Sequence, residues 1–165
     1  MAILRILTIP DPALKNPAKT VGSIGPDTAE IIRDLIETMR HHTRCVGLAA
    51  PQAGISLAIV VVDVSLYPRK FNNHGQLVLI NPKITETIGN IMGREGCLSV
   101  PDLTANVSRF EKITVEAMDE NFNKIKINTS GFEAVVLQHE IDHLSGLLFL
   151  DRVTSLKTDV FRRKP

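Results

Sequence analysis

Residues 130–146 read SGFEAVVLQHEIDHLSG. Ser130, followed three residues later by Glu133, is typical of a helix N-terminus, and the glycine at the end of the stretch is typical of the position just past a helix. On that helix His139 and His143 lie one turn apart on the same face, close enough to share a tetrahedral metal ion. The stretch therefore predicts a helix that carries a metal site.

Glu140 directly follows the first of these histidines. Its carboxylate would reach a water at the metal site without being a ligand itself, as in His-Glu-x-x-His hydrolases. The alternative is a solvated helix face with two unrelated histidines. A chance match of this kind has odds of roughly one in a hundred in a chain of this length, so we favour the metal site.

A catalytic metal site of this type needs a third protein ligand. No Glu follows Glu140, and position 149, where the extended zinc-protease motif has a third His, is Phe149. Cys97 lies upstream in residues 95–99 (EGCLS). Taken alone it would be interpreted as a small buried apolar residue. Beside the helix motif it completes a thiolate and two-imidazole set that suits zinc or ferrous iron with an open fourth position.

Residues 47–54 read GLAAPQAG and contain one polar side chain, Gln52. A packing turn of small residues is the simplest interpretation of such a stretch. As part of an active site, the small residues would leave room for a substrate. The Gln52 amide would then donate a hydrogen bond to a developing oxyanion.

Outside this motif, the sequence predicts mostly strands and few helices. An apolar stripe predicts a helix over 27–43 that starts at a capping box of Asp27 and Glu30, and a short helix is expected over 155–163. Residues 65–76 read as a loop, and a turn at 119–121 joins the last two strands as a hairpin. Hairpin-like connections outnumber βαβ units, so we expect an α+β fold with antiparallel sheets. The expected strands are 58–64, 77–80, 83–88, 112–118 and 124–129.

Composition excludes several functions. The chain has 165 residues, which suits one domain with a short tail, and a net charge of +1, which argues against a dedicated binder of nucleic acid or anionic membranes. One Tyr and 6 Phe offer little surface for stacking bases. Two Cys do not make a disulfide framework, and residues 1–10 lack a signal-peptide pattern, so we expect a cytoplasmic protein.

In chain order, the segment around Gln52, the segment around Cys97 and the helix with His139 and His143 together resemble the peptide deformylases. The family patterns correspond to residues 45–52 (CVGLAAPQ), 95–99 (EGCLS) and 138–144 (QHEIDHL), and the opening residues 10–14 (PDPAL) are also similar. The likeness covers residues 3 to about 150. It implies a single catalytic domain over 1–165, with antiparallel β-sheets packed around a central metal-bearing α-helix.

The resemblance implies a reaction and roles for residues. Cys97, His139 and His143 would hold one divalent ion, natively Fe²⁺, with Zn²⁺, Ni²⁺ and Co²⁺ as alternatives. Glu140 would take a proton from the attacking water and return it to the leaving amine, which releases formate from an N-formylmethionyl chain. The oxyanion would be stabilised by Gln52 and the backbone N–H of Leu98. The methionine side chain would be bordered by Val46, Gly47, Val135 and Val136.

The expected partners follow from the same resemblance: formylmethionyl nascent chains and, by family analogy, the ribosome, with no membrane and no direct recognition of nucleic acid. The basic residues 162–164 would form a solvated tail or touch RNA. Two alternatives share the helix motif. One is a metallopeptidase of other amide specificity, and the other is a non-catalytic metal-binding module with a fourth protein ligand.

Two positions depart from the family pattern. Cys45 stands where the first motif has Gly. If this position requires a positive φ or lies against the substrate backbone, Cys45 would narrow the entrance or strain the turn. Thr104 stands where many members carry Arg, and Arg109 is a second basic residue nearby. Glu95, close to Cys97 in the sequence, is expected to accept a hydrogen bond from a metal-bound imidazole, because such ligands usually donate their other N–H.

Overall fold

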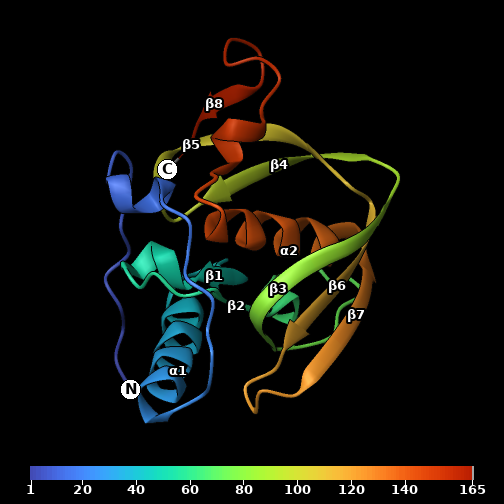
Figure 1. Ribbon diagram of the computed structural model, residues 1–165. Helices are drawn as coiled ribbons and strands as arrows, with labels where there is room; N and C mark the ends of the chain where they lie inside the picture. The colour runs from blue at the N-terminus through green and yellow to red at the C-terminus, as the bar shows by residue number, and fades with distance from the viewer. Residues whose placement is uncertain (165) are drawn as a thin grey trace.

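The computed structural model describes residues 1–164, which form two α-helices and two antiparallel sheets (Figure 1). The helices are α1 (Pro26–His41) and α2 (Gly131–Leu144). The five-stranded sheet has the order β1 (Gly47–Ala49), β2 (Ile59–Val62), β3 (Leu77–Ile88), β6 (Lys112–Met118) and β7 (Lys124–Ser130). The three-stranded sheet has the order β4 (Ile91–Cys97), β5 (Val100–Arg109) and β8 (Val160–Arg162). Short 3₁₀ helices are η1 (Pro12–Lys15), η2 (Ala50–Ala53), η3 (Val64–Leu66) and η4 (Phe149–Arg152).

Strand β2 is buried on both faces because a helix covers each side of the larger sheet. Val60 and Val62 point into the core formed with α2, whereas Ile59 and Val61 point into the core formed with α1. Side chains alternate between the two faces of a strand. The uninterrupted apolar run of β2 is therefore what a central, doubly covered strand requires.

Helix α2 lies in the middle of the molecule, between the smaller sheet and the larger one (Figure 1). Its N-cap is Ser130, as predicted, but the serine side chain makes no capping bond. Glu133 does not complete a capping box either, because its buried carboxylate accepts from Thr129 Oγ1 and from the backbone of His74. Gly146, with φ of 72°, follows the helix in the left-handed conformation, as predicted.

The three-stranded sheet brings Cys97 to α2. Strands β4 and β5 form a hairpin whose register shifts between Gly96 and Cys97, next to the tight turn into β5. Val100, Val107 and Phe149 form a small core beneath this turn with the Cys97 side chain. The irregularity at the end of β4 thus turns a cysteine from a sheet edge toward the central helix.

Several sequence expectations were wrong in detail. Residues 155–163 do not form a helix but turns and β8, because Val160 and Phe161 find a pairing partner in Thr104 and Ala105 of β5. The strands expected at 77–80 and 83–88 are one strand, β3, whose pairing with β6 shifts register at residues 81–82 and again at residue 85. Strands β1, β4 and β5 were not predicted. Strands β1 and β4 are edge strands that contain glycine, whereas β5 lies between β4 and β8 and carries Pro101 and Asp102, residue types that are uncommon in strands.

The remaining elements agree with the expectations more closely. The hairpin of β6 and β7 is confirmed, and Asp119 Oδ1 accepts from the backbone N–H of Asn121 and Asn123 in its turn, each at 2.9 Å. Helix α1 is confirmed, but its N-cap is Gly25 with Pro26 in the first turn, not a capping box. Within residues 1–164, neither α-helix has the length and the apolar run needed to cross a membrane.

Candidate metal centre and active site

Three potential metal ligands converge where β4 ends against α2. The ligand atoms of Cys97, His139 and His143 all lie within 4.8 Å of one another. All three side chains are buried. Burial is the main cause that holds the pKa of His143 well below its usual range, so its imidazole is neutral, as a metal ligand must be. Burial would also lower the pKa of His139, but hydrogen bonds with Cys97 and Glu95 outweigh burial and raise it well above its usual range, so a metal bound at His139 would displace a proton.

The geometry of these donors fits a divalent metal ion. Cys97 Sγ lies 3.5 Å from His143 Nε2. Ligands at about 2.1 Å (N) and 2.3 Å (S) from a tetrahedral ion would lie about 3.6 Å apart. His139 is held through its other nitrogen, Nδ1, which lies 2.8 Å from Glu95 Oε1, and this leaves Nε2 for a metal. One thiolate and two imidazoles leave the fourth position to water or substrate.

Glu95 is part of a buried chain of charges behind His139, in agreement with the expectation that it supports an imidazole. Arg109 binds both Glu95 oxygens, at 2.8 and 2.9 Å, and also Asp142 at 2.6 Å. Burial by itself would raise the pKa of Glu95, but hydrogen bonds and charges of Arg109 and His139 outweigh burial and lower this pKa to about 2. Glu95 is therefore a carboxylate at neutral pH and fixes the orientation of His139.

The same contacts correct one sequence expectation. Arg109 was considered as a second basic residue near the substrate, but it is only 5% exposed and both ends of its guanidinium are occupied. Its role is to support the metal site from behind. No sequence pattern pointed to this pairing, because the partners Glu95 and Asp142 come from β4 and α2.

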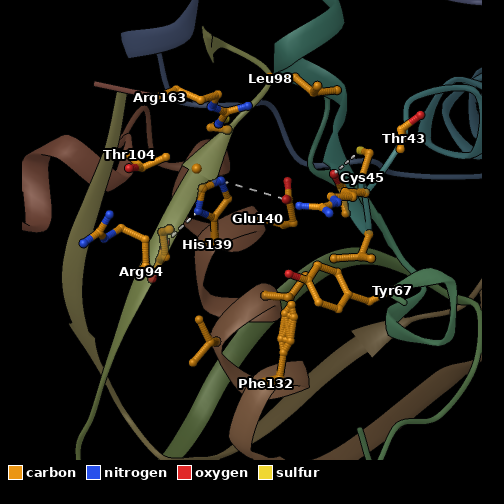
Figure 2. Close-up of a pocket in the computed structure, with 18 of the residues that line it drawn as sticks. Thr43, Cys45, Tyr67, Arg94, Leu98, Thr104, Phe132, His139, Glu140 and Arg163 are labelled. Carbon is orange, nitrogen blue, oxygen red and sulfur yellow. Dashed lines mark hydrogen bonds and ion pairs between the residues drawn. The ribbon is translucent and has the colours of Figure 1, made fainter. Parts of the chain in front are cut away.

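Glu140 lies beside His139 at the centre of the site, with 4.0 Å between Glu140 Oε1 and His139 Nε2 (Figure 2). Its other oxygen, Oε2, is buried and has no hydrogen-bond partner within residues 1–164. The pKa of Glu140 is raised to about 7, mainly by burial. The charge of His139 opposes this increase, and the charge of Glu95 adds to it. A carboxylate with a free oxygen and a pKa near neutrality suits reversible proton transfer.

Gln52 is buried next to the metal ligands. Its amide nitrogen donates to Ser99 Oγ at 3.1 Å and lies 3.4 Å from Cys97 Sγ, while its carbonyl oxygen accepts from the backbone N–H of Ala49 at 3.0 Å. The bond to Ala49 fixes which end of the amide faces the centre. The N–H₂ group is therefore the end that faces Cys97 and Ser99.

These groups open into a cavity of about 760 Å³. Every sequence-predicted site residue except His143 lines it, and His143 lies beneath it as the most buried of the three metal-ligand candidates. The structure adds the aromatic side chains of Tyr67 and Phe132, whose rings meet edge to face 5.1 Å apart. Tyr67 was missed because it lies in a loop, and Phe132 because it was assigned only to the first turn of the helix. The predicted lining residues are Val46, Gly47, Gln52, Cys97, Leu98, Val135, Val136, His139 and Glu140.

Cys45 and Thr104, which depart from the family pattern, both line the cavity. The Cys45 thiol donates to the carbonyl oxygen of Gly47 at 3.2 Å. Burial, with a smaller effect from the Glu140 charge, raises the pKa of Cys45 to about 12. Cys45 is thus a neutral thiol and is not part of the convergent set of Cys97, His139 and His143. The strain expected at this position is absent, since Cys45 is not among the residues with positive φ.

The family model described as polypeptide deformylase matches residues 3–159. The chain belongs to the polypeptide deformylase family. A peptide deformylase of Thermodesulfovibrio yellowstonii is 44% identical over 164 residues, which cover 99% of this chain and 97% of that protein. Peptide deformylase 1 of Vibrio vulnificus is 47% identical over 164 residues, which cover 99% of this chain and 94% of that protein.

Solved structures of the deformylase family share the fold. The crystal structure of a peptide deformylase from Legionella pneumophila has a TM-score of 0.86 and 41% identity, over 94% of this chain and 89% of that one. A Synechococcus elongatus peptide deformylase in complex with actinonin has a TM-score of 0.84 and 39% identity, over 93% of this chain and 80% of that one. The expected α+β fold with antiparallel sheets is confirmed.

As a deformylase, the chain is a metal-dependent hydrolase that removes the N-formyl group from newly synthesised polypeptides. The family match favours this activity over the two alternatives, a metallopeptidase of other specificity and a non-catalytic metal-binding module. The cluster of Cys97, His139 and His143 agrees with the metal dependence of the family.

Proposed function

We propose that Cys97, His139 and His143 hold one divalent ion in this deformylase and that Glu140 moves the proton of the reaction. The observation that carries the proposal is the convergence of these three donors within 4.8 Å, beside a buried carboxylate at the base of a cavity. Bound there, the ion supplies the positive charge that acidifies water and polarises the formyl carbonyl.

Fe²⁺ is the ion we propose for the native enzyme. A mixed set of one thiolate and two imidazoles accepts iron, zinc, nickel or cobalt, and availability in the cell decides among them. Support for iron comes from the resemblance to the family. The donor set itself supports a soft-to-borderline divalent ion over Mg²⁺ or Ca²⁺, which prefer oxygen ligands.

Glu140 is proposed as both general base and general acid. Its free Oε2 accepts a proton from the water that attacks the formyl carbon, and the same oxygen then returns this proton to the amine that leaves. A pKa of about 7 supports both directions of transfer at neutral pH. The products are formate and a free amino terminus.

The oxyanion that develops on the formyl oxygen needs hydrogen-bond donors. We assign this role to the N–H₂ group of Gln52 and to the backbone N–H of Leu98, next to Cys97. Support comes from the Gln52 amide, whose orientation is fixed by its bond to Ala49. Donors held in place before the reaction stabilise a transition state at little reorganisation cost.

The methionine side chain of the substrate is proposed to lie against the apolar part of the cavity. Val46, Val135 and Val136 line this part, and Gly47 keeps the space beside Glu140 open. Phe132 and Tyr67 extend the same apolar wall (Figure 2). An unbranched thioether side chain fits such a surface well.

The biological setting follows from the family. We propose formylmethionyl nascent chains as substrates, met at the ribosome in the cytoplasm, with residues 1–165 acting as one catalytic domain. Neither a membrane nor sequence-specific contact with nucleic acid is needed for this reaction.

The proposal is tested with a pair of peptides that differ only in the formyl group. Enzyme prepared without oxygen should release formate from formyl-Met-Ala-Ser and leave the internal amide bonds of that peptide and of Met-Ala-Ser intact. Cleavage of Met-Ala-Ser at an internal bond would instead indicate an ordinary metallopeptidase.

Gln52→Glu tests the oxyanion role, since the variant keeps the shape of the side chain and its acceptor for Ala49 but replaces the donor with a carboxylate oxygen. We expect kcat to fall by roughly 10²–10³ with little change in metal content. The matched control is Gln76→Glu, because Gln76 is exposed and bonds only to Arg40. A raised KM with unchanged kcat for Gln52→Glu would make it a uniform binding contact instead.

A further inference from the structure

The charges around the mouth of the cavity are strongly one-sided. Four basic residues line it, here called the basic rim: Arg44, Arg94, Arg163 and Lys164. All four are exposed. Two carboxylates also line the cavity, but Glu95 is bound by Arg109 and Glu140 is buried at the base. In a chain with a net charge of only +1, this is a local concentration of positive charge.

Strand β8 brings Arg163 to the rim. Thr104 of β5 pairs with both Gly96 of β4 and Phe161 of β8, and the backbone N–H of Arg163 continues the ladder by donating to Asp102 at 2.9 Å. A Cβ placed on Gly96 would lie 2.3 Å from a terminal nitrogen of Arg163. The guanidinium therefore occupies the space left by the missing side chain of Gly96, in contact with the segment that ends in Cys97.

Arg94 is held on the same sheet face. Its guanidinium carbon lies 3.7 Å from the centre of the Phe161 ring, and its Nε donates to Asn106 Oδ1 at 3.1 Å. Residues two apart on a strand share a face. Arg94 precedes Gly96 by two residues, and Arg163 follows Phe161 by two residues. Gly96 and Phe161 both pair with Thr104, which lines the cavity, so Arg94 and Arg163 lie on the sheet face that borders the cavity.

Arg163 lies away from the apolar wall. Figure 2 shows Arg163 and Phe132 on opposite sides of His139 and Glu140, where the formyl carbon would react. A substrate whose methionine side chain lies against the apolar wall must send the rest of its chain elsewhere, and Arg163 lines the other side of the cavity. Within residues 1–164, no carboxylate forms an ion pair with Arg44, Arg94, Arg163 or Lys164.

We propose that the basic rim binds a carboxylate of the substrate peptide beyond its formylated methionine, and that Arg163 is a specificity-determining residue. The carboxylate is an Asp or Glu side chain within the first few residues, or the free C-terminal carboxylate of a short peptide. A guanidinium is the side chain best suited to such a group because it donates in a fixed fork. This inference rests on the proposed function of the site.

The experiment compares three formylated peptides with amidated C-termini: formyl-Met-Ala-Asp, formyl-Met-Ala-Ser and formyl-Met-Ala-Lys. The wild-type enzyme should have a kcat/KM at least about fivefold higher for the Asp peptide than for the Lys peptide, as expected for a partly exposed charge pair. Formyl-Met-Ala-Ser with a free C-terminus distinguishes the two sources of carboxylate, because its gain over the amidated form measures the terminal carboxylate alone.

Arg163→Glu should abolish or invert the preference for the Asp peptide. The matched control is Arg162→Glu, an equal charge change on the neighbouring β8 residue, which is exposed and does not line the cavity. The control should retain the wild-type ratio. Arg163→Gln removes the charge without reversing it and should give an intermediate ratio of kcat/KM between the Asp and Lys peptides. This variant keeps the inference testable if Arg163→Glu disrupts the pairing of β8.

Salt gives a second readout on the unmodified enzyme. Between 0.05 and 0.5 M NaCl the screening length falls from about 14 to about 4 Å, so the preference for the Asp peptide should fall by at least half. Equal kcat/KM for the Asp and Lys peptides at low salt would overturn the inference. The inference would also be overturned if Arg163→Glu had the wild-type ratio of kcat/KM between the Asp and Lys peptides. This includes the outcome in which the variant only binds ribosomes less well, since Arg163 would then contact RNA rather than the substrate.

The neutral Ser peptide keeps the two hypotheses distinguishable. Turnover of this peptide without any effect of charge overturns the basic rim alone. Absence of formate release from every peptide by metal-loaded enzyme overturns the proposed function and, with it, the inference.

Discussion

Arg109 lies behind the metal site and joins residues from both sides of it. Through Glu95 it fixes the orientation of His139, and through Asp142 it binds the helix that carries both histidines. Asp142 also accepts a hydrogen bond from Arg152, which lies nearer the surface. Removing one member of such a buried set leaves its partners charged and unpaired, whereas loss of an exposed ion pair costs little.

Two arginines on the same carboxylate allow a matched stability test. The Arg109 side chain is 4% exposed and the Arg152 side chain 47% exposed. Arg109→Ala should lower the free energy of unfolding by about 3–5 kcal/mol and the Tm by about 10 °C. Arg152→Ala should cost about 1 kcal/mol or less. Equal losses in thermal melts would show that burial does not set the strength of this network.

The chemistry of Cys45 gives a second test at this scale. With a pKa of about 12, its thiolate fraction at pH 8 is about one in ten thousand, and the thiolate is the reactive form. Iodoacetamide at pH 8 should leave Cys45 unmodified in the folded, metal-loaded protein but label it after unfolding, as read by mass spectrometry. Rapid labelling in the folded protein would contradict a neutral, half-buried thiol.

At the scale of elements, the approach of β1 to α2 forms the floor of the cavity. The contact is closest at Gly47, where a Cβ would lie 2.7 Å from Glu140 Oε1 and 2.8 Å from its Cγ. Glycine at this position is a requirement of space rather than of backbone conformation, because its φ is not in the left-handed region. The small residues of the 47–54 segment thus let a strand edge pass beside the proposed base.

Gly47→Ala should therefore displace the Glu140 carboxylate. We expect kcat to fall by about 10²-fold with metal content retained, since a shift of about 1 Å in a reacting group has an effect of this size. The control is Gly93→Ala on β4, where a Cβ would meet nothing within 4 Å. If both variants keep the wild-type kcat, the position of Glu140 is not critical.

Sequence reasoning worked best where a local pattern determines the structure. The start and end signals in residues 130–146 sufficed to predict α2, an apolar run sufficed for β2, and the alternation of polar and apolar residues across a turn sufficed for the hairpin of β6 and β7. It was wrong at residues 155–163, where pairing with β5 rather than local propensity determines the conformation. The proposed metal ligands and Glu140 follow from motifs, whereas Arg109 and Arg163 make contacts between distant segments that no motif records.

At the scale of the whole molecule, the site lies where two sheets meet around one helix (Figure 1). Cys97 comes from the smaller sheet, Gly47 and Gln52 from the larger sheet and the turn after it, and the histidines from α2 between them. Each layer has its own apolar core, so the site is supported on rigid elements from several directions. The near-neutral net charge conceals a polarised cavity, with buried carboxylates at its base and the basic rim at its mouth.

In the proposed mechanism Glu140 performs the proton transfers next to an ion held by Cys97, His139 and His143. The most direct test measures formate release from formyl-Met-Ala-Ser and bound metal in the same anaerobic samples of wild type and Glu140→Gln. We predict about one metal ion per chain in both proteins, with kcat reduced by at least about 10²-fold in the variant. A Glu140→Gln enzyme with full metal content and a kcat near that of the wild type would contradict the account.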